Sequence, residues 1–202
     1  MPRIVRTIFD SGSVNLSTSV QPQTEKIVPN HGDIKGFNII VTATAAGTLT
    51  TAKKLAYCID SIDLLDKNSQ PILSKIRGQD LALIYFERNG GKAVTETDVA
   101  SGSNTDKYWL PLRIDGSMQA TKLTVNLAAY SNMAASGATA GTARVIIAAV
   151  YEDDANDKRT ERMFRIQKSL ASGTNAFAPD IVKARLIKST WFSIGTESNL
   201  TD

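Results

Sequence analysis

The chain has 202 residues, a formal net charge of +3, one histidine and one cysteine. A chain of this length can form a single all-β domain that buries roughly 70% of the surface exposed by its unfolded form. One cysteine excludes an internal disulfide framework, and a small charge spread over scattered basic residues gives no reason to expect a sequence-specific nucleic-acid partner.

The first 32 residues are polar and rich in Ser, Thr, Gln and Asn. This composition predicts an extended N-terminal arm at residues 1–32, whose order depends on a neighbour, followed by a single domain at residues 33–202. The tip of the arm is amphipathic, and we expect it to contact a neighbouring subunit or an anionic membrane surface through Arg3, Ile4, Arg6, Ile8 and Phe9. The alternative is a frayed chain end.

Strand signals begin after the arm. Apolar residues alternate from Phe37 to Val41, which predicts a strand. Residues 42–54 are rich in Thr, Ala and Gly and predict a loop. At residues 59–73 two apolar runs flank the polar turn 66–69, so this stretch predicts a β-hairpin.

The apolar spacing then becomes helical. The helix is expected to start at Ser74 or Gly78 and to stop at the Asn-Gly-Gly sequence of residues 89–91. We expect the helix to pack on the sandwich through one face and to show the other face to solvent, with Leu81, Ile84 and Tyr85 on the first and Glu87 and Arg88 on the second.

The second half of the chain predicts more strands. Residues 92–107 are expected to form a long polar loop. Aliphatic or aromatic residues alternate with others at residues 108–114, which predicts a strand. Because of Pro111, this strand is expected at a sheet edge or with a bulge. Residues 122–127 form another strand, residues 131–141 a small-residue linker, and residues 143–151 a central strand covered on both faces. With residues 163–167 and 182–194, the total is eight to nine strands and one helix.

Catalytic signals are weak. His31 lies in a polar turn, and Cys58 is expected to be a buried core thiol. One histidine and one cysteine cannot supply a zinc site, and the acidic run at residues 152–157 lacks the spacing of a calcium loop. No phosphate-binding glycine motif is present. We therefore predict no catalytic residues, no metal, no cofactor and no enzymatic activity.

Targeting signals are also weak. The N-terminus lacks the apolar core of a secretory signal, and no run approaches the ~20 apolar residues of a membrane-spanning helix. We therefore expect the protein to be made in a host cytoplasm.

The order of elements resembles a known family. The motifs are the hairpin IDSIDLLDKNSQPI, the short helix GQDLALIYFERNGG that follows it at once, and the later strand YWLPLRI. This arrangement is similar to that of the jelly-roll coat proteins of tailless, membrane-containing icosahedral bacteriophages, the PM2 and PRD1-like group. The resemblance implies a single jelly-roll β-sandwich of about eight strands with one short inserted helix.

The same resemblance implies a function. The chain would be a structural capsid protein of the virion that self-assembles into an icosahedral shell. Its partners would be other copies of itself, as a trimer or higher capsomer, other capsid proteins and an internal viral membrane.

Two other classes remain open. A β-sandwich binding module, of the carbohydrate- or receptor-binding type found in phage spikes and fibres, should display an aromatic platform. The residues placed to offer one are Tyr57, Tyr85, Phe86, Tyr108, Trp109, Tyr130, Tyr151, Trp191 and Phe192. An enzyme on a jelly-roll scaffold is the weaker option, because the chain lacks several metal-binding histidines.

Overall fold

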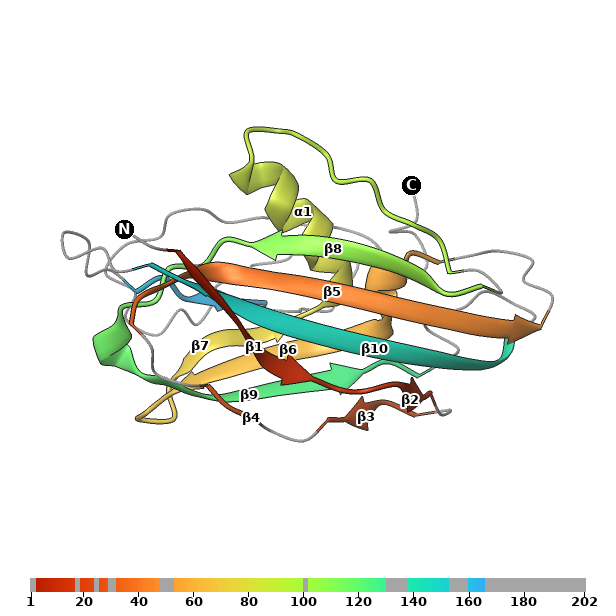
Figure 1. Ribbon diagram of the computed structural model, residues 1–202, viewed down its shortest axis with the longest axis horizontal. Helices are drawn as coiled ribbons and strands as arrows, with labels where there is room; N and C mark the ends of the chain where they lie inside the picture. The colour runs from red at the N-terminus through yellow and green to blue at the C-terminus, as the bar shows by residue number, and fades with distance from the viewer. Residues whose placement is uncertain are drawn as a thin grey trace, which may run out of the picture. The chain divides into compact units, whose positions relative to one another are not determined.

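The computed structural model describes residues 3–16, 19–23, 26–28, 32–47, 53–99, 102–129, 138–152 and 160–165. Within these ranges lie eleven strands, one α-helix and two short 3-10 helices. The strands form two sheets (Figure 1). No helix among the described residues is long and apolar enough to cross a membrane.

The first sheet, sheet A, has the strand order β1-β10-β5-β8, and the short β2 also pairs with β10. All its pairs are antiparallel. Its strands are β1 (Ile4–Asp10), β2 (Val14–Asn15), β5 (Ile34–Gly47), β8 (Asn104–Leu110) and β10 (Ala138–Tyr151). As predicted, the apolar run of residues 143–151 lies in a central strand, between β1 and β5.

The second sheet, sheet B, has the order β11-β7-β6-β9-β3, with the short β4 also paired to β9. Its pairs are antiparallel except for β11, which runs parallel to β7. Its strands are β3 (Gln21–Pro22), β4 (Lys26–Ile27), β6 (Ile59–Asp66), β7 (Pro71–Ile76), β9 (Ala120–Leu127) and β11 (Met163–Phe164).

The pairing is nested. β6 pairs with β7, and β5, which precedes them, pairs with β8, which follows. Further out, β3 and β4 pair with β9, and β1 pairs with β10. A long hairpin of this kind, rolled so that β10 also meets β5 and β6 also meets β9, is a jelly roll with strands distributed over two sheets. The predicted all-β jelly-roll sandwich with one inserted helix is therefore confirmed.

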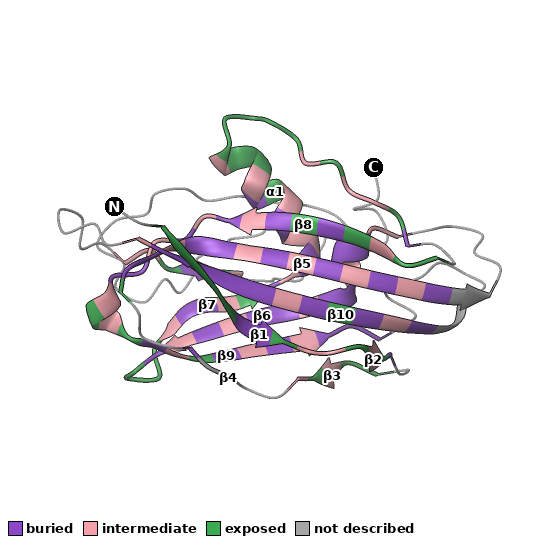
Figure 2. Ribbon diagram, viewed as in Figure 1, coloured by how far each residue is buried: buried purple, intermediate pink, exposed green. Residues whose placement is uncertain are grey.

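The core lies between the sheets. Phe37, Ile39 and Val41 point inward from β5 at alternate positions, while Leu123 and Val125 do so from β9, and all are almost fully buried. Buried positions alternate with partly or fully exposed ones along residues 37–45 of β5 and residues 141–147 of β10 (Figure 2). This period of two is what a strand with one core-facing side requires.

The segment expected to form an arm contributes to both sheets. β1 and β2 belong to sheet A, and β3 and β4 belong to sheet B. Several of its apolar side chains are buried, among them Phe9, Leu16 and Val28. The described part of residues 1–32 thus completes the jelly roll, while any role of this segment in tying subunits together stays a prediction.

The helix α1 (Gly78–Arg88) starts at the second of the two predicted positions, and Asn89 is its C-cap. The backbone N–H of Arg77 donates to the Asp80 carboxylate at 3.0 Å, which satisfies one donor at the helix start. Gly90 and Gly91 follow with φ angles of +64° and +79°, a region that glycine enters without strain. The Asn-Gly-Gly stop is therefore confirmed.

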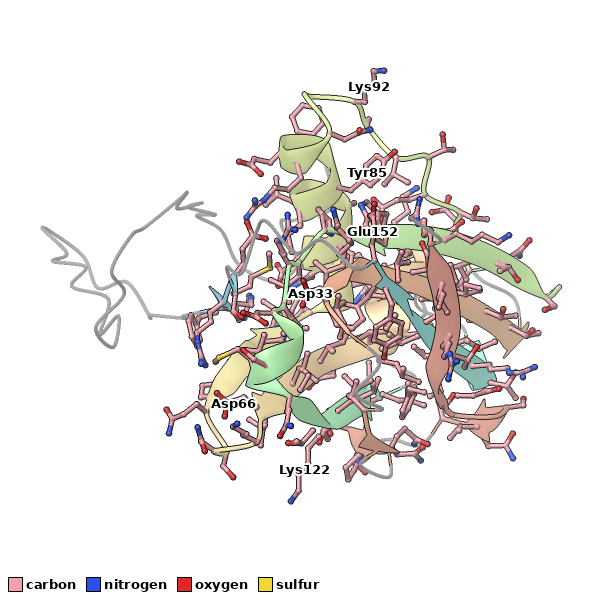
Figure 3. The ribbon with its side chains drawn as sticks, turned by 60° about the vertical axis from the view of Figure 1, so that its left-hand side comes forward. Asp33, Asp66, Tyr85, Lys92, Lys122 and Glu152 are labelled. Carbon is pink, nitrogen blue, oxygen red and sulfur yellow. The ribbon has the colours of Figure 1, made fainter. Side chains whose placement is uncertain are left out.

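The hairpin of β6 and β7 is closed by Asp66, whose side chain is only 2% exposed. Its carboxylate accepts hydrogen bonds from the backbone N–H groups of Asn68 and Gln70, at 2.8 and 2.9 Å. Arg162 donates to the same carboxylate at 3.0 Å. Figure 3 labels Asp66 at this turn. The predicted turn at residues 66–69 is confirmed. The burial of the Asp66 side chain and its contact with Arg162 were not predicted.

Two predicted loops are partly strand. β5 continues through residues 42–47, which were expected to be a loop, and β10 already begins at Ala138 within the expected linker 131–141. The two ends pair with each other, Ala43 opposite Ala143 and Thr44 opposite Thr142. Backbone hydrogen bonds pair strands whatever their side chains are, so a run of small residues can form a ladder without an apolar pattern. Residues 48–52 and 130–137 lie outside the described residues.

The strand near Pro111 is β8, at the edge of sheet A as predicted. It begins at Asn104, inside the expected loop, and ends one residue before the proline. A proline cannot donate a ladder hydrogen bond, so it terminates the strand.

The two 3-10 helices are η1 (Leu55–Cys58), before β6, and η2 (Gly116–Met118), before β9. The expected strand at residues 182–194 lies outside the described residues.

Candidate assembly surface

The sequence offers one cysteine and one histidine as residues with catalytic potential, and only the cysteine lies within the described residues. Cys58 is a free, fully buried thiol, and burial raises its pKa to about 12. A thiol in this environment stays protonated and unreactive at neutral pH. His31 lies outside the described residues, and within the described ranges no cluster of three or more His, Cys, Asp or Glu residues could hold a metal ion.

The acidic run at residues 152–157 is described only at its first residue. Glu152 forms a 3.3 Å ion pair with Lys35, and its backbone N–H donates to the carbonyl of Asp33 at 3.0 Å. These contacts fix the end of β10 against the start of β5. Residues 153–157 lie outside the described part of the chain.

A buried polar cluster holds the loop before β8. The Tyr108 hydroxyl lies 3.2 Å from carboxylate oxygens of both Glu96 and Asp106, and the Thr97 backbone N–H donates to Asp106 at 2.8 Å. Burial, followed by the two nearby carboxylates, raises the pKa of the Tyr108 hydroxyl, which therefore keeps its proton as a donor. Burial likewise raises the pKa of Glu96. The cluster anchors a loop to the sandwich.

The five predicted contact residues divide into two sets. Arg3, Ile4 and Arg6 are exposed on β1 or just before it. Ile8 and Phe9 are buried in the sandwich, at 7% and 2% exposure. The change from exposed to buried side chains along β1 occurs at a β-bulge between Thr7 and Phe9. In this conformation only the first half of β1 offers a contact surface, and the Arg3 guanidinium lies 5.8 Å from the centroid of the Trp109 ring.

The helix α1 is apolar on two opposite faces. Leu81 and Ile84 are buried, at 1% and 2% exposure, and Tyr85 is half-buried. On the far side Leu83 and Phe86 are exposed, at 44% and 45%. The predicted burial of Leu81 and Ile84 is thus observed, but the outer face is mainly apolar rather than charged.

The charged residues of α1 differ from the prediction in part. Glu87 is exposed as expected, whereas the Arg88 side chain is only 16% exposed and lies 3.6 Å from Glu161. Arg88 therefore does not simply face solvent. It joins the helix to the segment that carries β11.

That segment, residues 160–165, is fixed against α1 and the β6–β7 hairpin. Arg165 lies 3.4 Å from Asp80 in the first turn of α1, and Arg162 contacts Asp66 at the hairpin turn. Met163 is buried while Phe164 is 45% exposed. α1 and β11 thus lie on the side of the sandwich that carries β7 and the edge strand β8.

Six large apolar side chains are exposed among the described residues: Ile4, Val5, Val20, Leu83, Phe86 and Phe164. Ile4 and Val5 lie at the start of β1, which pairs with the end of β10. Leu83 and Phe86 lie on the outer face of α1. In Figure 3 α1 lies at the top of the sandwich and β1 at the right. The start of β1 and the outer face of α1 are the candidate assembly surface.

The aromatic residues do not assemble into an exposed platform among the described residues. Tyr108 and Tyr151 are buried, and Tyr57, Tyr85 and Trp109 are half-buried on different elements. Phe86 is the exposed member of the predicted set. Tyr130, Trp191 and Phe192 lie outside the described residues.

The sandwich belongs to the jelly-roll class, and solved viral structures share its fold. A chain in the atomic structure of Sulfolobus turreted icosahedral virus matches with a TM-score of 0.50 and 15% identity, over 75% of this chain and 45% of that chain. The major capsid protein (MCP) of the same virus matches with a TM-score of 0.47 and 14% identity, over 76% and 49% of the two chains. This chain therefore spans about half the length of these viral chains.

The capsid asymmetric unit of cyanophage Pam1 also matches, with a TM-score of 0.34 and 16% identity, over 74% of this chain and 85% of that chain. No protein-family model and no curated protein matches the sequence. At 15% identity, the similarity to the chain of Sulfolobus turreted icosahedral virus concerns the fold alone.

The outer face of α1 was missed although its signal is visible in the sequence. In the run DLALIYFER, apolar residues occupy nearly every position from Leu81 to Phe86. Such a run places apolar side chains all around a helix, which is typical of a helix covered on every side. The helical spacing identified Leu81 and Ile84 as part of the covered face, but the prediction assigned no side to Leu83 and Phe86.

Proposed function

We propose that the chain is a structural subunit of a viral capsid, without catalytic activity, that self-assembles into an icosahedral shell. The observation that carries the proposal is the nested jelly-roll pairing with a helix inserted between β7 and β8, a fold shared with a chain of an icosahedral virus. The PM2 and PRD1-like group is the proposed relationship.

The distribution of surface chemistry supports this proposal. A soluble monomer seldom exposes grouped large apolar side chains, and such groups mark sites of association. Here Ile4 and Val5 are exposed at the start of β1, and Leu83 and Phe86 are exposed on α1.

The proposed partners follow from this role. The chain associates with its own copies as a trimer or higher capsomer, and with other capsid proteins, in a virion assembled from protein made in the host cytoplasm. Contact with an internal membrane is assigned to the exposed cations Arg3 and Arg6 of β1, because anionic headgroups attract basic side chains at a surface.

Sedimentation velocity of the purified full-length chain over a wide concentration range, with electron microscopy of the same samples, tests the proposal. We expect oligomers of three or more copies that grow with concentration, and shell-like particles at the upper end. A monomer that persists at every concentration contradicts a shell function and favours the binding-module class. Glycan-array binding by that monomer would then support the alternative directly.

A further inference from the structure

The segment that leads from α1 to β8 is fixed to the sandwich by its own backbone. The backbone N–H of Leu55 donates to the carbonyl of Thr97 at 3.0 Å, and the N–H of Val99 donates to the carbonyl of Lys53 at 2.8 Å. The Val99 side chain is almost fully buried. In Figure 1 this segment passes β8 on the side away from β5. We call its described part, residues 92–99, the β8 loop.

A single phenolic proton lies between a carboxyl group of the β8 loop and one of β8. The Tyr108 hydroxyl oxygen lies 3.2 Å from an oxygen of Glu96, in the loop, and 3.2 Å from an oxygen of Asp106, in the strand. A phenol donates one hydrogen bond, and an ionised carboxylate can only accept. When both carboxyl groups are ionised, they therefore compete for this proton, and their like charges repel each other.

We infer that Glu96 is a proton-operated latch, which holds the β8 loop more tightly in mild acid than at neutral pH. When Glu96 takes up a proton from solvent, its carboxyl O–H donates to the Tyr108 hydroxyl, which in turn donates to the Asp106 carboxylate. The competition for one proton then ends, and the three groups form a chain of hydrogen bonds. This inference goes beyond the proposed shell function and does not depend on it.

Glu96, rather than Asp106, is the carboxyl group that takes up the proton. The Thr97 backbone N–H donates to Asp106 at 2.8 Å, and such a bond favours the charged carboxylate. Among the described residues, the Tyr108 hydroxyl is the one hydrogen-bond donor to Glu96. Burial is the largest influence on the pKa of Glu96, and the net effect raises that pKa above its ordinary 4.5.

The ionisable groups around Glu96 come from the stretch before β6, from the loop itself and from β8. They are Lys54, Tyr57, Asp98, Asp106 and Tyr108. Lys54 favours the charged form of Glu96, but its ammonium group lies 2.8 Å from Asp98, and the two side chains are 42% and 54% exposed. Solvent therefore screens the charge of Lys54. Asp98 and Asp106 favour the protonated form of Glu96, in the same direction as burial.

The direction of the pH effect follows from linkage. Glu96 has a raised pKa when the β8 loop is docked and its ordinary pKa of 4.5 when the loop is released. Protonation therefore favours docking. The contribution of Glu96 to docking is fully present below pH 4.5 and is lost as the pH rises through the raised pKa. The docking equilibrium should fall by about tenfold for each unit by which docking raises the pKa.

Hydrogen exchange of the full-length chain from pH 4 to pH 7.5, corrected for the intrinsic rate of each amide, tests the latch. The reporters are the amides of Thr97 and Val99, whose hydrogen bonds join the loop to the sandwich. In the parent, their protection should fall as the pH rises. Glu96→Gln places a neutral donor at the same position, so protection should stay high at every pH. Glu87→Gln, at an exposed position of α1, is the matched control and should follow the parent.

The carboxyl carbon of Glu96, followed by NMR in the parent, gives a second measurement that needs no variant. Its titration midpoint should lie above pH 4.5. A midpoint at or below pH 4.5 would overturn the inference, as would parent protection that is flat across the range. Protection in E96Q that falls with pH as in the parent would show that another group is responsible and would overturn it too.

Discussion

Leu81 and Leu83 lie two positions apart in α1, but their environments differ sharply. Leu81 is 1% exposed and Leu83 is 44% exposed. Leu81→Ala should lower the free energy of unfolding by about 2–5 kcal/mol, because it removes buried methyl groups and leaves a cavity. Leu83→Ala should change it by less than about 0.5 kcal/mol. Urea unfolding of the two variants compares them directly, and equal effects would mean that α1 is not packed as described.

The Asp66 carboxyl makes the free energy of unfolding depend on pH in the acidic range. Burial tends to raise the pKa of its carboxyl, but hydrogen bonds from Gln70, Arg162 and Asn68 outweigh burial and lower that pKa below its ordinary 3.8. The folded state therefore favours the charged carboxylate. Its contribution to the free energy of unfolding is present above pH 3.8 and is lost as the pH falls toward the lowered native pKa.

Asp66→Asn should thus reduce stability at neutral pH and should flatten the loss of stability below pH 4 relative to the parent. Asp60→Asn, at a half-exposed position of the same strand, is the control. The measurement is the urea midpoint from pH 7 to pH 2.5. If the parent and D66N lose stability in parallel across this range, the carboxylate is not the group responsible.

At the scale of elements, the junction between α1 and η1 depends on Gly78. A Cβ atom built at this position would lie 1.7 Å from the carbonyl oxygen of Ala56 in η1. Gly→Ala inside a helix normally stabilises by up to about 1 kcal/mol. Here Gly78→Ala should instead destabilise, because the helix must move away from η1. Gly102→Ala, which meets no atom within 4 Å, is the matched control.

Thermal unfolding followed by circular dichroism measures both glycine variants. The expected outcome is a lower midpoint for G78A and a nearly unchanged one for G102A. A stabilised G78A protein would show that α1 and η1 are further apart than described.

The elements that the sequence predicted well are those whose signals are local. The β6–β7 hairpin has a polar turn between two apolar runs, and α1 has helical apolar spacing followed by Asn89 and two glycines. The extent of β5 and β10 was not predictable in this way. Their paired ends consist of Ala, Thr and Gly, which carry no apolar period.

Long-range pairing explains why other features of the structure were not predicted from the sequence. Asp10 and Arg144, which are 134 positions apart, form a 2.7 Å ion pair that joins β1 to β10. Nothing near Asp10 in the sequence indicates this partner, so residues 1–32 were predicted as an arm. The candidate contact was predicted at Arg3, Ile4, Arg6, Ile8 and Phe9 from local amphipathicity. Ile8 and Phe9 are instead buried in the sandwich, which no signal in the neighbouring sequence indicates.

At the scale of the whole molecule, β1 should be required for folding. Deleting residues 1–12 removes Phe9, which is 2% exposed, and uncovers one side of β10. The arm interpretation predicts that this deletion leaves the sandwich folded. The pairing of β1 with β10 predicts a protein that unfolds at lower urea concentration and binds hydrophobic dyes. Deletion of residues 1–3 alone keeps every β1 pair and is the control. If the protein that lacks residues 1–12 is as stable as the parent, the arm interpretation of this segment is correct and the pairing of β1 is not needed for stability.

Because the strand pairs are nested, β1 is translated before the other described strands but must wait for β10 before it can pair. The β6–β7 hairpin can close as soon as residue 76 is made, but β1 pairs with residues 146–151. At about 5–20 residues per second, synthesis of the intervening chain takes roughly 7–30 seconds. During this time an unpaired β1 can add to other strand edges. The jelly roll therefore forms outward from the β6–β7 hairpin. The strands that precede this hairpin find their nested partners in the reverse of the order in which they are translated.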